Sequence, residues 1–471
     1  MTLTPGDDLN ETRRQRTRDQ FALLQRAGST AVIVDSDDPA DFTFACHSAR
    51  VLVNDNQDVA RLQRYFQGRI DDDNGVFDGL GAPEDPQPDG LPFVRYVLPN
   101  RRDAVPGDRS LLLTLDELDQ DPETRDLARP DHVVHICPGG RPSHCPATEP
   151  TETDREPWPT RADVNPAAGD GSGVRVVVID TGWYDPARDG IQPSPWPWIR
   201  HVVNGEPEPE GIRDPNDPNA PLRQYAGHGT FITGVIASIA PEAEIWVLSL
   251  PRDPDLLQGG VFESEIVSQL DAALALDPHL INLSAGCPTR LNRPARGFER
   301  WWDDVTSKTP EPQWVLVASA GNNASPWAFW PASFDWALGV GSLDRDGHVS
   351  NFSNWGDSVD VYALGRNIVN AFPKGDYVCQ ESPDRGDVRS FNHWRARWSG
   401  TSFSAPLVTG LIAQALSQQE DEMDARVARD AVLGGPPLGP LPTDVNQAGR
   451  RMMPVLRAGH VPVAAESLLI T

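Results

Sequence analysis

Residues 173–180, "GVRVVVID", form a nearly continuous aliphatic run that ends in a carboxylate. Such a run is typical of a strand that is buried on both faces of a parallel sheet. The segments 244–250 ("EIWVLSL"), 280–286 ("LINLSAG") and 314–322 ("WVLVASAGN") repeat the pattern, and 264–276 ("SEIVSQLDAALAL") has helical spacing. Because strands alternate with helical segments, the sequence predicts an α/β fold with a doubly wound, mostly parallel sheet.

Polar side chains stand at the ends of these elements, where ligands gather in folds of this type. Asp180 closes the first strand, Asn322 follows another, and His228 and Ser402 open apolar helical segments. Each residue alone is weak evidence, because a carboxylate after a strand is common and a polar residue at a helix start is more often a cap. The chain order Asp180, His228, Ser402, with a glycine-bearing motif around each, is one of the three orders in which serine-peptidase triads occur.

Three segments resemble the signature blocks of subtilisin-like serine peptidases, the subtilases. They are "VVVIDTGW" (176–183), "GHGTFITGVIAS" (227–238) and "SGTSFSAPLVTG" (399–410). The resemblance begins near residue 170, reaches at least residue 415 and leaves the N-terminal 145 residues outside. It implies a serine endopeptidase that hydrolyses peptide bonds through an acyl-enzyme intermediate.

The same resemblance implies a role for each polar residue. Ser402 matches the nucleophile, which needs an adjacent base because a serine hydroxyl is a poor nucleophile at neutral pH. His228 matches that base and the later general acid, and Asp180 matches the carboxylate that holds the imidazole. Asn322, in "AGN", matches the amide of the oxyanion hole, and the Ser402 N–H at the helix mouth would be the second donor.

Substrate contacts follow less directly from the sequence. The segment "NLSAG" resembles the strand with which the family pairs extended substrate backbone, by strand addition. The residues expected beside the substrate are Ser284, Ala285 and Gly286. In "LLQGGVF", Gly259 and Gly260 form either the opposite wall of the cleft or a simple glycine turn, and the sequence does not separate the two.

No metal or cofactor is expected. The segment after His228 runs straight from helix to strand, without the calcium-binding loop that interrupts this helix in many subtilases. Five cysteines are scattered along the chain, too few for a disulfide framework in a chain of this size. The cluster "HVVHICPGGRPSHCP" (132–146) could hold a structural zinc or a Cys137–Cys145 disulfide, but its spacing matches no familiar zinc site, so ordinary surface residues are the favoured interpretation.

The specificity region departs from the family. Before Trp330 and Pro331 the family often has a small residue at the floor of the primary pocket, where this chain has Phe329. The hypothesis is a shallow pocket that prefers a small or modest side chain, and the alternative is that Trp327 and Phe329 pack in the core. Long inserts precede His228 and Ser402, and long loops around a site favour a selective enzyme.

The composition along the chain predicts three parts: an α/β domain at 1–145, a Pro- and acid-rich linker at 146–170 and a peptidase domain at 171–471. In the first part we expect a strand at "ARVLVND", an amphipathic helix at "QDVARLQRYFQ" and further strands at "LPFVRYVLP" and "SLLLTL". This domain is either an inhibitory or folding-assisting prodomain or a retained domain that docks a substrate or a regulatory protein, and we favour the second.

The net charge of the chain limits the classes of partner that it is expected to bind. The 471 residues carry a formal net charge of −27, which argues against nucleic acid and anionic membranes as partners and leaves a polypeptide substrate. The first twenty residues lack the basic and apolar regions of a signal peptide, and no run approaches the ~20 apolar residues of a membrane helix. We therefore expect a cytoplasmic protein. The alternative to an enzyme is a catalytically silent scaffold that binds partners, and the intact chemical positions disfavour it.

Overall fold

The computed structural model describes most of the chain. The described residues are 14–15, 17–19, 22, 32–36, 43–70, 75–103, 110–135, 148–164, 169–209, 211–217, 219–251, 260–419 and 423–434.

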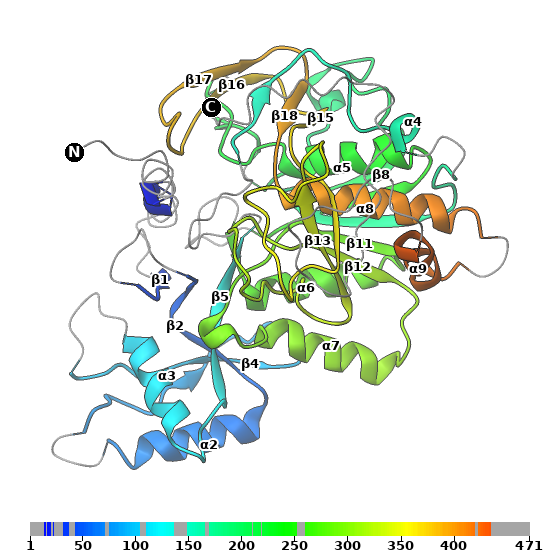
Figure 1. Ribbon diagram of the computed structural model, residues 1–471. Coiled ribbons are helices and arrows are strands. Elements are labelled where there is room, and N and C mark those ends of the chain that lie inside the picture. Colours follow the sequence, from blue (N-terminus) through cyan, green and yellow to red (C-terminus); the bar gives the residue numbers. More distant parts are fainter. Residues whose placement is uncertain are drawn as a thin grey trace.

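The larger unit is built on a seven-stranded sheet whose strand order is β14-β13-β12-β11-β7-β9-β8, with every neighbouring pair parallel (Figure 1). Its strands are β7 (Arg175–Asp180), β8 (Val202–Gly205), β9 (Glu244–Ser249), β11 (Leu280–Leu283), β12 (Val315–Ser319), β13 (Ala337–Leu343) and β14 (Val361–Leu364). The strand order runs both ways from β7, so the prediction of a doubly wound parallel sheet is confirmed.

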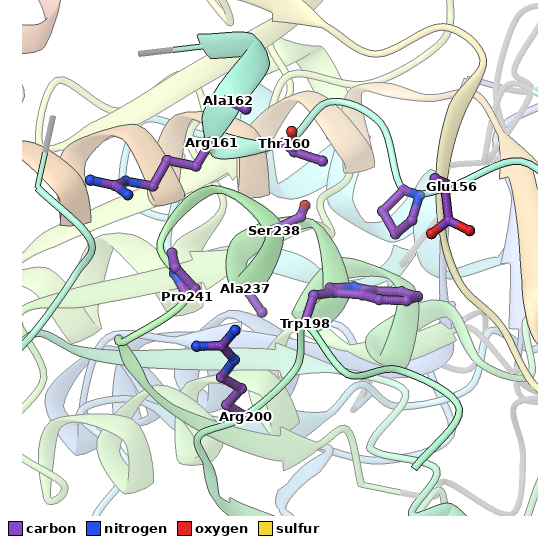
Figure 2. Close-up of a pocket in the computed structure, with 10 residues that line it drawn as sticks. Glu156, Thr160, Arg161, Ala162, Trp198, Arg200, Ala237, Ser238 and Pro241 are labelled. Carbon is purple, nitrogen blue, oxygen red and sulfur yellow. The ribbon is translucent and has the colours of Figure 1, made fainter. Parts of the chain in front are cut away.

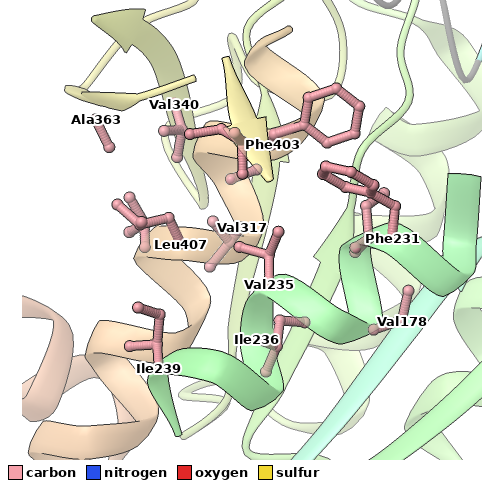
Figure 3. Close-up of a cluster of buried hydrophobic side chains, with 14 of the residues drawn as sticks. Val178, Phe231, Val235, Ile236, Ile239, Val317, Val340, Ala363, Phe403 and Leu407 are labelled. Carbon is pink, nitrogen blue, oxygen red and sulfur yellow. The ribbon is translucent and has the colours of Figure 1, made fainter. Parts of the chain in front are cut away.

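Helices cover both faces of this sheet. On one face lie α5 (His228–Ile239) and α8 (Thr401–Leu416), and on the other lie α6 (Glu263–Leu274) and α7 (Arg296–Lys308). Side chains alternate along β7: Val176 and Val178 join the core under α5 and α8, whereas Val177 and Ile179 join the core under α6 and α7 (Figure 3 shows the first core). This two-sided burial explains why the strand reads as a continuous aliphatic run.

The smaller, N-terminal unit has a six-stranded sheet with the order β10-β5-β2-β4-β3 and with β1 beside β2. The elements are β1 (Val32–Val34), β2 (Ala45–Val53), α2 (Asn56–Gln67), β3 (Ala82–Pro83), β4 (Val94–Val97), α3 (Ser110–Gln120), β5 (Ala128–His135) and β10 (Gly260–Phe262). Strand β10 comes from the peptidase part of the chain, so the two units share this sheet.

The prediction of a strand at "SLLLTL" was wrong, because residues 110–120 form the helix α3. Its buried residues are Leu111, Leu112, Thr114, Leu115 and Leu118, which follow the helical repeat. Leu113, Asp116 and Gln120 lie on its exposed face. A window of six residues with three successive leucines does not distinguish a buried strand from a helix.

Residues 148–164, which lie within the expected linker, pack along the larger unit. There β6 (Thr151–Glu152) pairs with β18 (Arg395–Trp398), which in turn pairs with β15 (Ile368–Ala371). Trp158 and Val369 exchange both backbone hydrogen bonds, at 2.9 and 3.0 Å. The segment is therefore extended but held at several points.

The remaining elements lie around the larger unit. They are the hairpin β16 (Gly375–Val378) and β17 (Val388–Phe391), built from the insert before Ser402, the short helices α4 (Arg161–Val164), η1 (Pro186–Asp189) and η2 (Arg290–Asn292), and α9 (Ala425–Gly434), which packs on α8.

Candidate active site

Asp180 and His228 form a buried hydrogen-bonded pair. Asp180 is the last residue of β7 and His228 is the first of α5, and both are fully buried. His228 Nδ1 lies 2.7 Å from Asp180 Oδ1, which also accepts the Thr181 N–H at 2.7 Å. Because a carboxylate only accepts, the hydrogen bond fixes the imidazole with its proton on Nδ1 and leaves Nε2 as the basic atom.

The backbone before His228 has a conformation that glycine adopts readily. Gly227 is the N-cap of α5 and has φ 78°, in the left-handed region. A Cβ at this position would also lie 2.4 Å from Pro373 Cδ. Glycine at this cap therefore lets the helix begin abruptly at His228, next to the end of β7.

Ser402 lies in the first turn of α8 and is buried. Its carbonyl oxygen accepts the Ser284 hydroxyl at 2.9 Å, and the ring of the following Phe403 lies 5.4 Å from the His228 ring, centroid to centroid. In the described part of the chain, Ser402 Oγ and His228 Nε2 have no hydrogen-bond partner. The two atoms expected to exchange a proton therefore belong to adjacent elements but are not joined by a hydrogen bond, as is common in serine-protease sites without substrate.

Asn322 is tied to the same helix mouth. Its Oδ1 accepts both the backbone N–H of Thr401, at 2.8 Å, and the Thr401 hydroxyl, at 3.0 Å. These bonds orient the amide with Oδ1 toward the helix, so that the donor Nδ2 lies on the other side. Asn322 follows β12 and is buried, as expected for a residue after a strand end.

The expected substrate strand already has a partner. Gly286 and His135 exchange both backbone hydrogen bonds, at 2.9 and 3.0 Å, and His135 also pairs with Gly260 through β5 and β10. Strand β5 of the N-terminal unit thus lies between the two predicted walls. Ser284 and Ala285 are buried beside it, whereas Gly259 lies outside the described residues.

His135 is a site residue that the sequence analysis missed. Burial lowers the pKa of its imidazole to about 4, so the side chain is neutral near pH 7. The paired β-branched residues of "HVVH" are the signal that could have indicated a strand here, but a strand pattern does not name its pairing partner.

Phe329 fills space beside the expected substrate strand. A Cβ built on Gly286 would lie 2.4 Å from Phe329 Cε1, and one on Gly321 would lie 3.1 Å from Phe329 Cγ. The ring is therefore wedged between these two glycines and is buried. Trp327 is 59% exposed, so the alternative that both aromatic residues pack in the core does not hold for Trp327.

A cavity of about 200 Å³ remains next to Phe329. It is lined by Thr43, Pro288, Asn354 and residues 323–329. Thr43 belongs to the N-terminal unit, so both units contribute to this cavity.

A larger cavity, of about 470 Å³, lies elsewhere (Figure 2). Trp198, Arg161 and Arg200 line it together with Ser238, which is near the C-terminal end of α5. Because α5 rises about 1.5 Å per residue, Ser238 lies roughly 15 Å along the helix from His228. This cavity is therefore separate from the Asp180–His228 pair.

The structure describes only part of the cluster at 132–146. His132 and His135 are buried, so the expectation of ordinary surface residues was wrong for these two. Within the described residues, no group of three or more His, Cys, Asp or Glu side chains is arranged to hold a metal ion. Cys46, Cys287 and Cys379 are buried free thiols, whereas Cys137, His144 and Cys145 lie outside the described residues. None of the helices in the described part of the chain has the length and apolar character needed to cross a bilayer.

The doubly wound parallel sheet, the buried Asp–His pair and the serine at the mouth of a neighbouring helix, in the chain order Asp, His, Ser, fit the subtilisin-like class of α/β proteins. The chain belongs to the Subtilase family, whose sequence model matches residues 171–434.

The individual relatives share about 30% sequence identity or less with this chain. The thermophilic serine proteinase of Bacillus sp. (strain AK1) is 30% identical over 270 residues, which cover 55% of each chain. Subtilisin Savinase of Lederbergia lenta is 28% identical over 278 residues, which cover 56% of this chain and 85% of Savinase. The match therefore spans only about half of the thermophilic proteinase. Among solved structures, the patellamide maturation protease PatA is 24% identical with a TM-score of 0.45, over 61% of this chain and 95% of that one.

Proposed function

We propose that this protein is a serine endopeptidase that acts through Asp180, His228 and Ser402. The observation that carries the proposal is the buried 2.7 Å hydrogen bond between His228 and Asp180. The ring of Phe403, the residue after Ser402, lies 5.4 Å from the His228 ring, so the helix that carries the proposed nucleophile packs against the imidazole. Family membership supports the same chemistry.

In the proposed mechanism, Ser402 Oγ attacks the carbonyl carbon of the substrate while His228 Nε2 takes its proton. The imidazolium that forms is stabilised by Asp180 through the Nδ1–H hydrogen bond. His228 then gives the proton to the leaving amine, and water hydrolyses the acyl-enzyme by the reverse sequence. Full burial of both partners strengthens this interaction, because water does not screen it.

We propose that Asn322 Nδ2 and the Ser402 backbone N–H stabilise the oxyanion. The hydrogen bonds from Thr401 to Asn322 Oδ1 support this role, because they preorganise the amide at the helix mouth. A donor fixed before the reaction costs no reorganisation when charge develops on the oxygen.

The proposed substrate is an extended polypeptide with a small residue before the scissile bond. Gly286 would pair with the substrate backbone, together with Ser284, Ala285, Gly259 and Gly260. The wedged ring of Phe329 supports the small-residue preference, because it takes the volume that a large side chain would need.

We propose that residues 1–145 form a regulatory domain, joined by residues 146–170 to the peptidase domain at 171–471. The pairing of His135 with Gly286 supports regulation, because this strand uses the backbone groups that a substrate would use. Whether the domain is removed as a prodomain or retained for a protein partner is decided by the masses of the mature chain.

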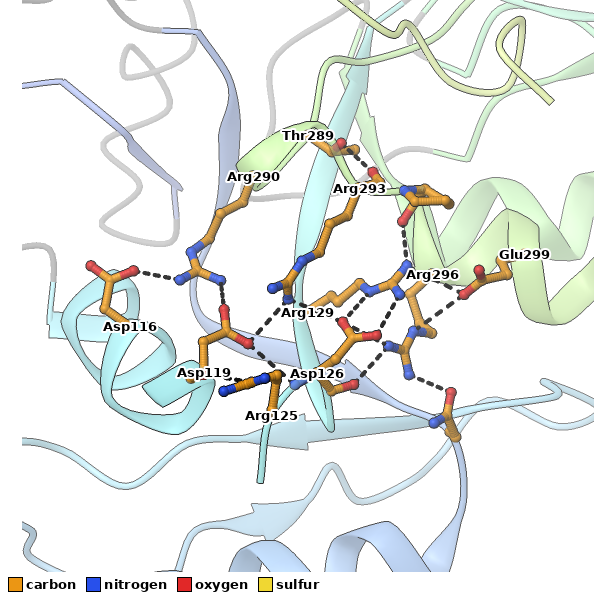
Figure 4. Close-up of polar contacts among 12 residues, drawn as sticks. Asp116, Asp119, Arg125, Asp126, Arg129, Thr289, Arg290, Arg293, Arg296 and Glu299 are labelled. Atoms are coloured by element: carbon orange, nitrogen blue, oxygen red, sulfur yellow. Dashed lines mark hydrogen bonds and ion pairs between the residues drawn. The ribbon is translucent and has the colours of Figure 1, made fainter. Parts of the chain in front are cut away.

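Arginines of the larger unit meet carboxylates of the smaller one (Figure 4). Arg290 contacts Asp116 and Asp119, and Arg293 contacts Asp119 at 3.0 Å and Asp126 at 3.1 Å. The Arg290–Asp119 pair is largely buried, with side chains 9% and 15% exposed, so it is screened less than a surface pair. The contacts support stable docking of the proposed regulatory domain.

Hydrolysis of an unfolded protein substrate tests the proposal. Ser402→Ala should lower turnover by about 10⁶, to background. Ser404→Ala is the matched control, because Ser404 lies in the same turn but donates its hydroxyl to the Ala363 carbonyl. Equal loss in both variants, or activity in Ser402→Ala, would contradict the proposal.

A further inference from the structure

Glu208 lies in the long insert between Asp180 and His228, shortly after the edge strand β8. Two residues before Glu208, the backbone of Glu206 is held by two hydrogen bonds. The Glu206 N–H donates to the Val247 carbonyl at 3.0 Å, and the Glu206 carbonyl accepts the Trp183 N–H at 2.7 Å. These bonds direct the chain toward the loop that follows β7.

The Glu208 carboxyl contacts both loops that carry the Asp–His pair. Its Oε1 accepts the Gly227 N–H at 2.6 Å and lies 3.4 Å from the Thr181 hydroxyl. Gly227 immediately precedes His228, and Thr181 immediately follows Asp180. Thr181 Oγ1 in turn accepts the Gly229 N–H at 3.0 Å, so the same small network reaches both sides of His228.

The backbone of Glu208 also lies against the loop after Asp180. Gly182 has φ 116°, and a Cβ at this position would lie 2.7 Å from the Glu208 nitrogen. This close approach leaves the loop little freedom to move away from Glu208.

We propose that Glu208 is a positioning residue that sets the orientation of His228 relative to Asp180. This inference rests on the proposed function, in which that pair activates Ser402. The Glu208 carboxyl accepts hydrogen bonds from Gly227, which precedes His228, and from Thr181, which follows Asp180. Loss of this acceptor therefore releases both residues at once. Small misplacements of catalytic groups cost about 10²-fold in rate.

The charge state of Glu208 fits this role. Burial, with a contribution from the charge of Asp180, raises the pKa of Glu208 to about 8, against the opposing effects of the Gly227 N–H, the Thr181 hydroxyl and Arg223. The carboxyl is therefore neutral below that pH and adds no second negative charge beside Asp180 and His228. Above pH 8 it ionises, and the field at the imidazole changes.

The test compares the rate of labelling by a fluorophosphonate, from pH 6 to pH 10, in wild type, Glu208→Ala, Glu208→Gln and Asp217→Asn. At pH 6 we expect Glu208→Ala to react about 10- to 100-fold more slowly. Glu208→Gln should retain the wild-type rate within about threefold, because its amide oxygen still accepts the Gly227 N–H. Asp217 is exposed in the same insert, and within the described part of the chain its hydrogen bonds stay in its own turn, so Asp217→Asn should match wild type.

The pH profile distinguishes a positioning role of Glu208 from a general effect of the substitutions on protein stability. Wild type and Asp217→Asn should show an inflection near pH 8 that Glu208→Gln lacks. The inference is overturned if Glu208→Ala reacts as fast as wild type, if Glu208→Gln is as slow as Glu208→Ala at pH 6, or if the inflection persists in Glu208→Gln.

A second measurement does not depend on activity. The proton in the His228–Asp180 hydrogen bond should give a low-field resonance in the proton NMR spectrum, which Glu208→Ala should shift or broaden while Glu208→Gln preserves it. If neither wild type nor Arg290→Glu, a variant that loosens the N-terminal unit, is labelled but the resonance responds in this way, the proposed function fails and the positioning role stands. If Glu208→Ala leaves the resonance unchanged, the positioning role is refuted.

Discussion

The side-chain amide of Asn322 has two proposed functions, one for its oxygen and one for its nitrogen. Its oxygen holds the backbone and hydroxyl of Thr401, and its nitrogen is the proposed oxyanion donor. The chemistry therefore depends on an amide, not only on a polar side chain, because a carboxylate of the same size lacks the donor.

Asn322→Ala should lower kcat by about 10²–10³ with little change in KM, because an oxyanion donor acts in the transition state. Steady-state hydrolysis of a peptide substrate measures both constants. Asn322→Asp keeps an acceptor for Thr401 but removes the donor, so it should be nearly as slow. A kcat in Asn322→Asp close to that of wild type would rule out the donor role.

In the proposed function, Phe329 limits the volume of the primary specificity pocket. Phe329→Gly should shift cleavage toward large aromatic residues before the scissile bond, by at least about tenfold relative to small ones, because it vacates the space between Gly286 and Gly321. Loss of a buried Phe costs about 3–5 kcal/mol of stability, so Phe329→Leu serves as a milder variant with an intermediate shift.

A peptide library read by mass spectrometry checks this preference. Trp355→Ala is the matched control, because Trp355 is an exposed aromatic residue that is not among the residues lining the cavity beside Phe329. If Phe329→Gly and Phe329→Leu both keep the wild-type preference, Phe329 does not limit the pocket.

At the scale of elements, β5 is the contact between the two units. It pairs with β10 through residues 133–135, and its Asp131 accepts the N–H and hydroxyl of Ser264 in the first turn of α6. A carboxylate at a helix N-terminus satisfies a free donor and complements the helix dipole. The strand is therefore held by backbone pairing, by a cap and by the arginine contacts near η2.

Arg290→Glu should loosen this docking, because it sets a third negative charge against Asp116 and Asp119 at a buried position. Removing one partner of a fully buried ion pair costs about 3–5 kcal/mol, and the largely buried Arg290–Asp119 pair should lose part of this, so hydrogen exchange of residues 128–135 should accelerate by about tenfold. Lys308→Glu on α7 is the control, since Lys308 is exposed and pairs with Asp304 on its own helix. Equal exchange in the two variants would mean that the arginine contacts do not hold β5.

The elements also show what the sequence could and could not predict. Strands such as β7 were predictable because burial on both faces leaves a continuous aliphatic run. Asp180, His228 and Ser402 could be proposed from the sequence because each stands at an element end inside a recognisable motif, and their catalytic roles stay predictions. α3 was misassigned because three successive leucines fit either structure. The pairing of His135 with Gly286 was out of reach, because partners about 150 residues apart leave no local pattern.

For the whole molecule, the central question is whether a competent nucleophile lies beneath a docked N-terminal unit. The described chain meets the peptidase on both sides of residues 136–147: His135 pairs with Gly286, and the Thr148 carbonyl accepts the Trp398 indole N–H. Intact masses distinguish a retained unit from a removed one.

The most direct test of the account is intact-mass analysis of the full chain after fluorophosphonate treatment, in wild type, Ser402→Ala, Ser404→Ala and Arg290→Glu. Arg290→Glu should loosen the N-terminal unit, so it distinguishes a site that this unit covers from a site that is inactive. The account predicts one label, mapped to Ser402, in wild type, Ser404→Ala and Arg290→Glu, and none in Ser402→Ala. Label that persists in Ser402→Ala, or its absence from both wild type and Arg290→Glu, would contradict it.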